Sequence, residues 1–240
     1  MSEISVLLIG FLLGMRHATD ADHLAAVATL ATQQHSLAQS MRQGVAWGIG
    51  HTVTLLLFGG VVLVLGASIP PRVAMTLELV VGGMLILLGV DVLRRLAHQR
   101  IHVHIHTHAT EVRHLHVHSH LSAGLGADPR HVHAHAAGLP WRALAVGMTH
   151  GMAGSAALIV LSLGAAQSWK VGLAFIALFG MGSIAGMAVL SMVIAIPLRF
   201  TAAHFSRCFG GLTAVVGAYS CTLGLLTVCR IWIAQVAAFG

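Results

Sequence analysis

The amino-acid sequence predicts an all-α, polytopic membrane protein with six transmembrane helices arranged as two inverted three-helix repeats. Composition predicts the membrane class, because 57% of the 240 residues are hydrophobic and only 8% are charged. A soluble domain of this size carries far more charge. Two further observations, the lengths of the apolar segments and an internal repeat, predict the number and arrangement of the helices.

Six apolar segments are long enough to cross a bilayer, for which a helix needs about 20 residues. They cover residues 4–31, 43–66, 73–93, 141–165, 169–198 and 209–236. The first segment has no basic N-terminal region and contains charged residues, so we expect a membrane span and not a cleaved signal peptide. The chain then divides into a first membrane repeat (1–96), a loop (97–139) and a second membrane repeat (140–240).

Basic residues predict the orientation of these spans. The connections after the first, third and fifth spans, together with Arg142 at the start of the fourth span, contain nine of the 13 Lys and Arg residues. By the positive-inside rule these connections face the cytoplasm, which places both termini outside a bacterial inner membrane. Trp141, Trp169 and Trp232 lie near span ends, as interfacial anchors do. The basic residues are spread over loops, so we expect no nucleic-acid partner. We expect the membrane lipid to surround the helices.

The internal repeat consists of two pairs of similar segments. "GMRHATDADHL" at 14–24 is echoed by "GMTHGMAGSAAL" at 147–158, and "GIGHTVTLL" from Gly48 is echoed by "GMGSIAGM" from Gly180. The offsets of 133 and 132 residues nearly agree, which favours a true repeat over chance similarity between Gly-rich spans. Because each repeat has an odd number of spans, the two repeats must be inverted, as in many secondary transporters.

Residues 97–139 form a histidine-rich loop with twelve of the 18 His residues. Most of them recur at i, i+2, which suits neither an amphipathic helix nor a packed core, and we expect disorder in the absence of metal. Imidazole binds Ni, Co, Zn and Cu, so the loop is a candidate metal buffer or sensor. The alternative explanation is that the repetitive His sequence has no function and arose by sequence drift in a loop that tolerates change.

The first span contains the charged segment "RHATDADH" at 16–23. At a helix centre Arg16, Asp20 and Asp22 together cost on the order of 8 to 10 kcal/mol to insert, too much for an accident. On a regular helix Arg16, His17, Asp20 and His23 share one arc, and Arg16 can pair with Asp20 at i, i+4. Asp22 falls on another face, so either it acts from that face or the helix is broken at the motif.

Two His and two Asp residues form a typical metal-ligand set. A further His lies in each of two other spans, within Gly-rich surroundings that allow close helix packing. The candidate metal-site residues are therefore His17, Asp20, Asp22, His23, His51 and His150. We expect Arg16 and Asp20 to orient the other ligands. A buried ion-pair network that only fixes helix packing is the alternative, although ionisable residues within membranes are usually functional.

The segment "RHATDADHL" resembles the signature helix of the nickel/cobalt transporter (NiCoT) family, with His17, four residues, then Asp22 and His23. "GIGHTVTLL" is similar to that family's second His-containing span. The number of spans resembles the shorter branch labelled urease accessory membrane protein or high-affinity nickel transport protein. The resemblance implies a secondary permease for Ni²⁺ or Co²⁺ in which those three residues are required. The downstream acidic motifs are replaced by "GMTHGMAGS" and "FGMGSIAGM", without a carboxylate.

These observations favour a transporter of nickel or cobalt with no prosthetic group, and nickel-enzyme maturation proteins as its partners. An efflux permease and a zinc permease are the alternatives, and the direction of transport stays open. A membrane metalloenzyme needs an HExxH helix or a larger set of His boxes, which the sequence lacks, so we expect no enzyme. The three Cys residues have no CxxC spacing and an odd count, which predicts free thiols.

Overall fold

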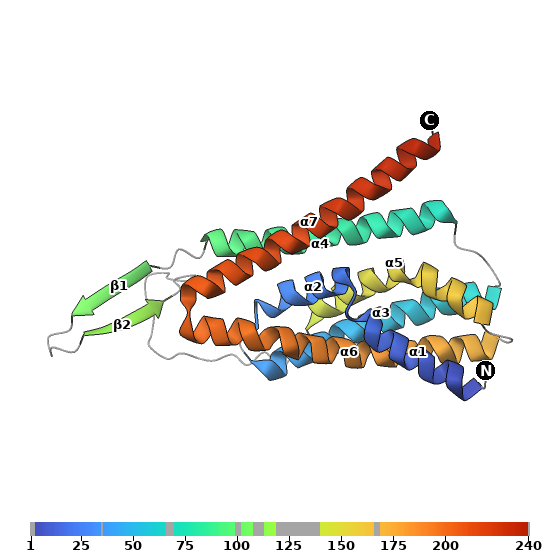
Figure 1. Ribbon diagram of the computed structural model, residues 1–240, viewed down its shortest axis with the longest axis horizontal. Helices are drawn as coiled ribbons and strands as arrows, with labels where there is room; N and C mark the ends of the chain where they lie inside the picture. The colour runs from blue at the N-terminus through green and yellow to red at the C-terminus, as the bar shows by residue number, and fades with distance from the viewer. Residues whose placement is uncertain are drawn as a thin grey trace.

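The computed structural model describes residues 3–34, 36–65, 70–98, 102–107, 113–118, 140–165 and 169–239, and we consider only these residues below. They form seven helices and two strands (Figure 1). The helices are α1 (Glu3–His17), α2 (Ala21–Ala31), α3 (Leu37–Leu65), α4 (Pro71–His98), α5 (Trp141–Ala165), α6 (Trp169–His204) and α7 (Ser206–Phe239). The strands are β1 (His102–Thr107) and β2 (Arg113–His118).

Four of the described helices are long and apolar enough to cross a membrane: α3, α4, α6 and α7. Their most apolar windows have mean hydropathies between 1.7 and 2.2. Large apolar side chains point outward from them, among them Leu87 at 72% exposure and Ile233 at 66%. Such a surface is unfavourable in water and favourable in lipid. The prediction of a helical membrane protein is therefore confirmed.

The predicted first span is divided into two short helices. α1 ends at His17 and α2 begins at Ala21, and the two follow one another along the long axis of the molecule (Figure 1). Of the two arrangements considered for the charged segment, the structure has the broken helix. The break lies inside the segment 16–23. A continuous membrane-spanning helix would place the charged side chains of Arg16, Asp20 and Asp22 of this segment within the bilayer.

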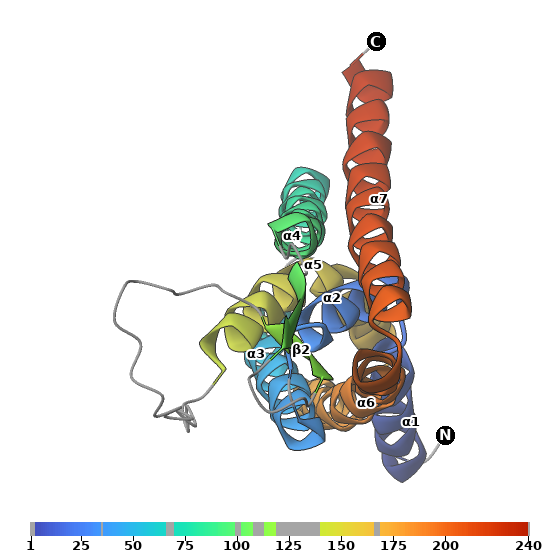
Figure 2. The same ribbon diagram turned by 90° about the vertical axis from the view of Figure 1, so that its left-hand side faces the viewer.

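The helices pack as a central group and a lateral pair. α3 and α6 lie against each other, α1 packs on α6, and α5 packs on α3. α4 and α7 pack on each other to one side of this group, as Figure 2 shows. The described ends of the chain, near Glu3 and Phe239, lie at one end of the molecule, and the two strands lie at the other (Figure 1).

Glycines permit unusually close contact between the central helices. A Cβ atom at Gly14 of α1 would collide with the carbonyl oxygen of Phe179 on α6. In the same way, a Cβ atom at Gly147 of α5 would collide with the carbonyl oxygen of Trp47 on α3. Small residues bring helix backbones together in membranes, where packing rather than the hydrophobic effect drives association. The side chains of neighbouring helices can therefore reach one another across the centre of the bundle.

The histidine-rich loop is described only in part, and that part differs from our expectation of disorder. β1 and β2 pair antiparallel, with His104 opposite His116 and Ile105 opposite Leu115. The alternation of His with aliphatic residues has the period of a β-strand, and this signal predicts the two strands. The remainder of the predicted loop lies outside the described residues.

The packing of α4 on α7 can be tested with two glycines of α4. A Cβ atom at Gly89 would lie 2.5 Å from Cys221 Sγ, whereas one at Gly83 would meet nothing within 4 Å. We expect Gly89→Leu to destabilise the protein by about 1 to 3 kcal/mol through overpacking, and Gly83→Leu to leave stability nearly unchanged. Thermal unfolding in detergent measures the difference. Equal melting temperatures for the two variants would contradict the observed interface.

Candidate metal centre

The break between α1 and α2 is a tight turn closed by hydrogen bonds. The Thr19 hydroxyl donates to the Arg16 carbonyl oxygen at 2.6 Å, and the Asp20 amide donates to the His17 carbonyl oxygen at 3.0 Å. Asp20 then adopts an extended conformation immediately before α2. His17 is thus the last residue of one short helix, and Asp22 lies in the first turn of the next, where a negative charge is favourable.

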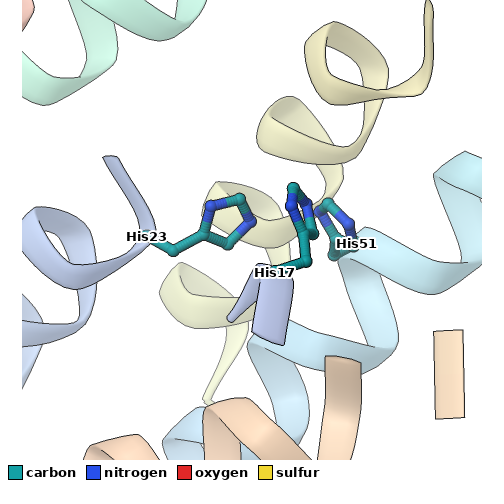
Figure 3. Close-up of side chains that lie close together, drawn as sticks. All are labelled: His17, His23 and His51. Atoms are coloured by element: carbon teal, nitrogen blue, oxygen red, sulfur yellow. The ribbon is translucent and has the colours of Figure 1, made fainter. Parts of the chain in front are cut away.

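Three imidazoles converge beside this break, one each from α1, α2 and α3 (Figure 3). The ring centroids of His17 and His23 are 4.4 Å apart, and the His51 ring lies 5.3 Å from each of them. One ligand nitrogen from each ring lies within 4.8 Å of the others. His23 and His51 are completely buried, and the side chain of His17 is 16% exposed.

Several nitrogens of these buried rings have no hydrogen-bond partner among the described residues. They are Nε2 of His17, Nε2 of His23 and both ring nitrogens of His51. Buried polar atoms in folded proteins nearly always have a partner, because an unsatisfied one costs about 1 to 3 kcal/mol. Four such nitrogens lie on three adjacent rings, and each neutral ring offers one lone pair. This makes the cluster a candidate binding site for a metal ion, which accepts nitrogen lone pairs.

Carboxylates contact two of the three imidazoles at the ring nitrogen Nδ1. Asp20 Oδ2 lies 2.7 Å from His17 Nδ1, and Asp22 Oδ1 lies 3.0 Å from His23 Nδ1. Because a carboxylate only accepts hydrogen bonds, these contacts place the ring proton on Nδ1 and leave the lone pair on Nε2. The same pairing of carboxylate with histidine orients histidine ligands in known metal sites.

The predicted pair of Arg16 with Asp20 is not among the ion pairs of the described residues. Asp20 pairs with His17 instead, and the Arg16 side chain is exposed. The prediction assumed a continuous helix, in which residues four apart are neighbours. Since α1 ends at His17, that relation does not hold. Asp20 lies against one imidazole and is 53% exposed, so it belongs behind His17 rather than among the converging atoms.

Asp22 connects the imidazole cluster to α5. Its Oδ2 atom accepts a hydrogen bond from His150 Nε2 at 2.8 Å, while its Oδ1 atom faces His23. The rings of His23 and His150 are 4.2 Å apart, and His150 is 1% exposed. Asp22, His23 and His150 form a second group whose ligand atoms lie within 4.8 Å of one another. The structure therefore brings together five of the six candidate residues, with Asp20 outside them.

Two aromatic residues that the sequence analysis did not single out complete the surroundings. Trp47 is fully buried and stacks on His23, with ring centroids 5.4 Å apart, and Phe179 lies 5.2 Å from His17. Trp47 stands four residues before His51 on α3, so helical spacing could have indicated that both face the same side. Phe179 comes from a helix distant in sequence, and no local signal marks it.

Other ionisable groups lie apart from the centre. Asp91 pairs with Arg95 at 3.0 Å and with Arg142 at 3.8 Å, while Glu78 is exposed. The three cysteines are free thiols, as predicted.

The fold and this geometry define a helical membrane protein with a buried cluster of histidines and a carboxylate at a broken helix. The chain is 33% identical over 229 residues to the urease accessory protein UreH of Bacillus sp. (strain TB-90), an alignment that covers 92% of this chain and 90% of that protein. It belongs to the family of the urease accessory protein UreH. No protein-family model and no solved structure matches the chain.

The unpartnered nitrogens make metal stabilisation testable. We expect Ni²⁺ at about 100 times its dissociation constant to stabilise the folded protein by about 2.7 kcal/mol, because only the folded chain brings the ligands together. His23→Ala should abolish this gain, whereas His98→Ala, which removes an exposed imidazole at the end of α4, should retain it. The measurement is the melting temperature with and without Ni²⁺. Equal gains in both variants would place the stabilising ion elsewhere.

Proposed function

We propose that this protein is a secondary transporter that carries nickel or cobalt ions across the bacterial inner membrane. The observation that carries the proposal is the set of unpartnered nitrogens on His17, His23 and His51, buried between α1, α2 and α3. Lipid offers such nitrogens no partner, whereas divalent ions of intermediate softness bind imidazole well. The ion is the transported substrate, and the proposal requires no prosthetic group and no enzymatic reaction.

A network that only fixes helix packing accounts less well for the same residues. In such a network the histidines would satisfy one another and the carboxylates, because unsatisfied polar groups in a dry interior are costly. Here Asp20 and Asp22 contact Nδ1 of His17 and of His23, and Nε2 of both rings has no partner among the described residues. This arrangement supports ligation of an ion between the rings.

The choice of nickel rests on likeness to other proteins. The similar protein from Bacillus is named a urease accessory protein, and urease is a nickel enzyme. The segment containing His17, Asp22 and His23 resembles the signature of the nickel/cobalt transporter family. Both likenesses favour nickel or cobalt over zinc. Nickel-enzyme maturation proteins on the cytoplasmic side are the proposed recipients of the ion.

Transport, rather than storage, is supported by the architecture around the site. α1 and α2 are the halves of a discontinuous span, and discontinuous spans hold the substrate in several classes of secondary transporter. We infer six membrane spans, with α1 and α2 counted as one, in two inverted repeats. The contact of Gly14 with Phe179 and that of Gly147 with Trp47 correspond to each other at the repeat offset. This correspondence supports a pseudo-twofold relation between the repeats.

The orientation follows from the arginine distribution. Nine of the 13 Lys and Arg residues lie near the junctions that follow α2, α4 and α6, at positions 42, 94, 95, 100, 113, 130, 142, 199 and 207. We therefore propose that these junctions face the cytoplasm and that both termini face outward. The histidine-rich loop is then cytoplasmic, where it serves as a metal buffer beside the permeation path. In this proposal the loop tunes the supply of ions, and the buried centre carries out translocation.

Flux through purified protein in liposomes tests the proposal. We expect wild-type protein to move Ni²⁺ across the membrane, reported by a metal-sensitive dye inside the vesicles. Asp22→Asn should reduce the rate by at least about tenfold, as loss of a group that holds histidine ligands does elsewhere. Asp91→Asn is the matched control, because it removes a carboxylate outside the centre, and it should transport normally.

The transporter proposal would be overturned if folded wild-type protein moved neither Ni²⁺ nor Co²⁺, whether the ion is supplied outside or inside the vesicles. Equal flux in Asp22→Asn and wild type would separate transport from the buried centre.

A further inference from the structure

The metal centre contains two overlapping groups of ligands that share one histidine. One group, the histidine position, consists of His17, His23 and His51, and the other, the carboxylate position, consists of Asp22, His23 and His150. Within each group the ligand atoms lie within 4.8 Å of one another. The rings of His51 and His150, which belong to different groups, are 6.5 Å apart, whereas each lies closer to His23. His23 therefore stands between the two positions.

His23 can serve only one position at a time. A neutral imidazole carries one proton on its two nitrogens, so it offers a single lone pair. His23 Nδ1 faces Asp22 at 3.0 Å, and His23 Nε2 has no partner among the described residues. A proton on Nδ1 directs the lone pair away from Asp22, and a proton on Nε2 directs it towards Asp22. The tautomer of His23 thus selects the position that can bind an ion.

The hydrogen bonds in the structure favour ion binding at the histidine position. Hydrogen bonds to carboxylates keep the protons of His17 and His23 on Nδ1 and leave both Nε2 atoms available. In the carboxylate position, Asp22 Oδ2 is occupied by the hydrogen bond from His150 Nε2. Nδ1 of His150 is unpartnered, so it can receive the ring proton when Nε2 becomes a ligand. Neither tautomer change alters the number of protons in the centre.

We propose that the centre holds one divalent transition-metal ion in two alternative positions, with His23 as the common ligand that exchanges it between them. The histidine position joins α1, α2 and α3, whereas the carboxylate position joins α2 and α5. Movement of the ion between them transfers it from ligands of the first repeat to a ligand of the second. This inference rests on the proposed function for its role in transport and on geometry alone for its two positions.

Each position has one histidine suited to selective removal. His51 contributes only to the histidine position, and His150 contributes only to the carboxylate position. The experiment measures Co²⁺ binding and its visible absorption in full-length protein in detergent, for wild type, His51→Ala, His150→Ala and the double variant. Subtraction of the His23→Ala titration removes the contribution of histidines outside the centre. His98→Ala is the control for loss of an exposed imidazole.

Each single variant should still bind one Co²⁺ at the centre, with affinity reduced about tenfold or less, because three ligands remain in the other position. The double variant should lose affinity by a factor larger than the product of the two single-variant factors, since no complete position remains. His150→Ala should keep the wild-type spectrum, and His51→Ala should show a different one with a carboxylate ligand. A variant that melts early without metal is replaced by His51→Asn or His150→Asn.

One shared coordination shell would give the opposite pattern. Both single variants would then lose affinity strongly and their effects would add in the double variant, and this result would overturn the proposal. Liposome flux separates the inference from the transport function. If wild-type protein binds Co²⁺ in the predicted pattern but moves no ion, the transporter proposal fails and the two positions stand. If the wild-type protein transports the ion but the affinity losses of the two single variants add in the double variant, only the proposal of two positions fails.

Discussion

Burial of imidazole nitrogens without hydrogen-bond partners is the constraint on which this structure depends. His17, His23 and His51 meet in the interior of an apolar helical protein, and three of their unsatisfied nitrogens are enough to cost several kcal/mol. Asp20 and Asp22 sharpen the constraint, since each holds a ring proton on the far side and directs a lone pair into the cluster. A divalent cation relieves this cost directly. The remainder of the fold can be understood as the means of assembling these groups in one place.

Two features of the fold perform that assembly. The break after His17 lets Asp22 join His17 and His23 at the centre, whereas a continuous helix would place Asp22 on another face. Glycines at the crossings of α1 with α6 and of α5 with α3 bring the backbones so close that short side chains meet. Trp47 and Phe179 then pack against the imidazoles and enclose them. The chain as a whole belongs to the family of the urease accessory protein UreH.

The sequence predicted the class of fold and most of the residues that meet beside the break, because both depend on strong local signals. Apolar segments of membrane length located the helices, and five charged or histidine residues in one span marked the centre. The pairing of Arg16 with Asp20 was wrong because helical spacing applies only within an unbroken helix. The strands of the histidine-rich loop were missed although their period-two alternation was present. Trp47 and Phe179 could not be assigned to the site, since their roles depend on tertiary packing between helices distant in sequence.

The central claim is that a divalent ion is ligated by the buried imidazoles. X-ray absorption at the nickel edge tests it most directly, using one equivalent of Ni²⁺ and a variant that lacks residues 98–135, so that the loop histidines do not contribute. The account predicts nitrogen or oxygen neighbours at about 2.0 to 2.1 Å together with the outer scattering of about three imidazole rings. A spectrum of water oxygens alone, or sulfur neighbours at about 2.3 Å, would contradict it.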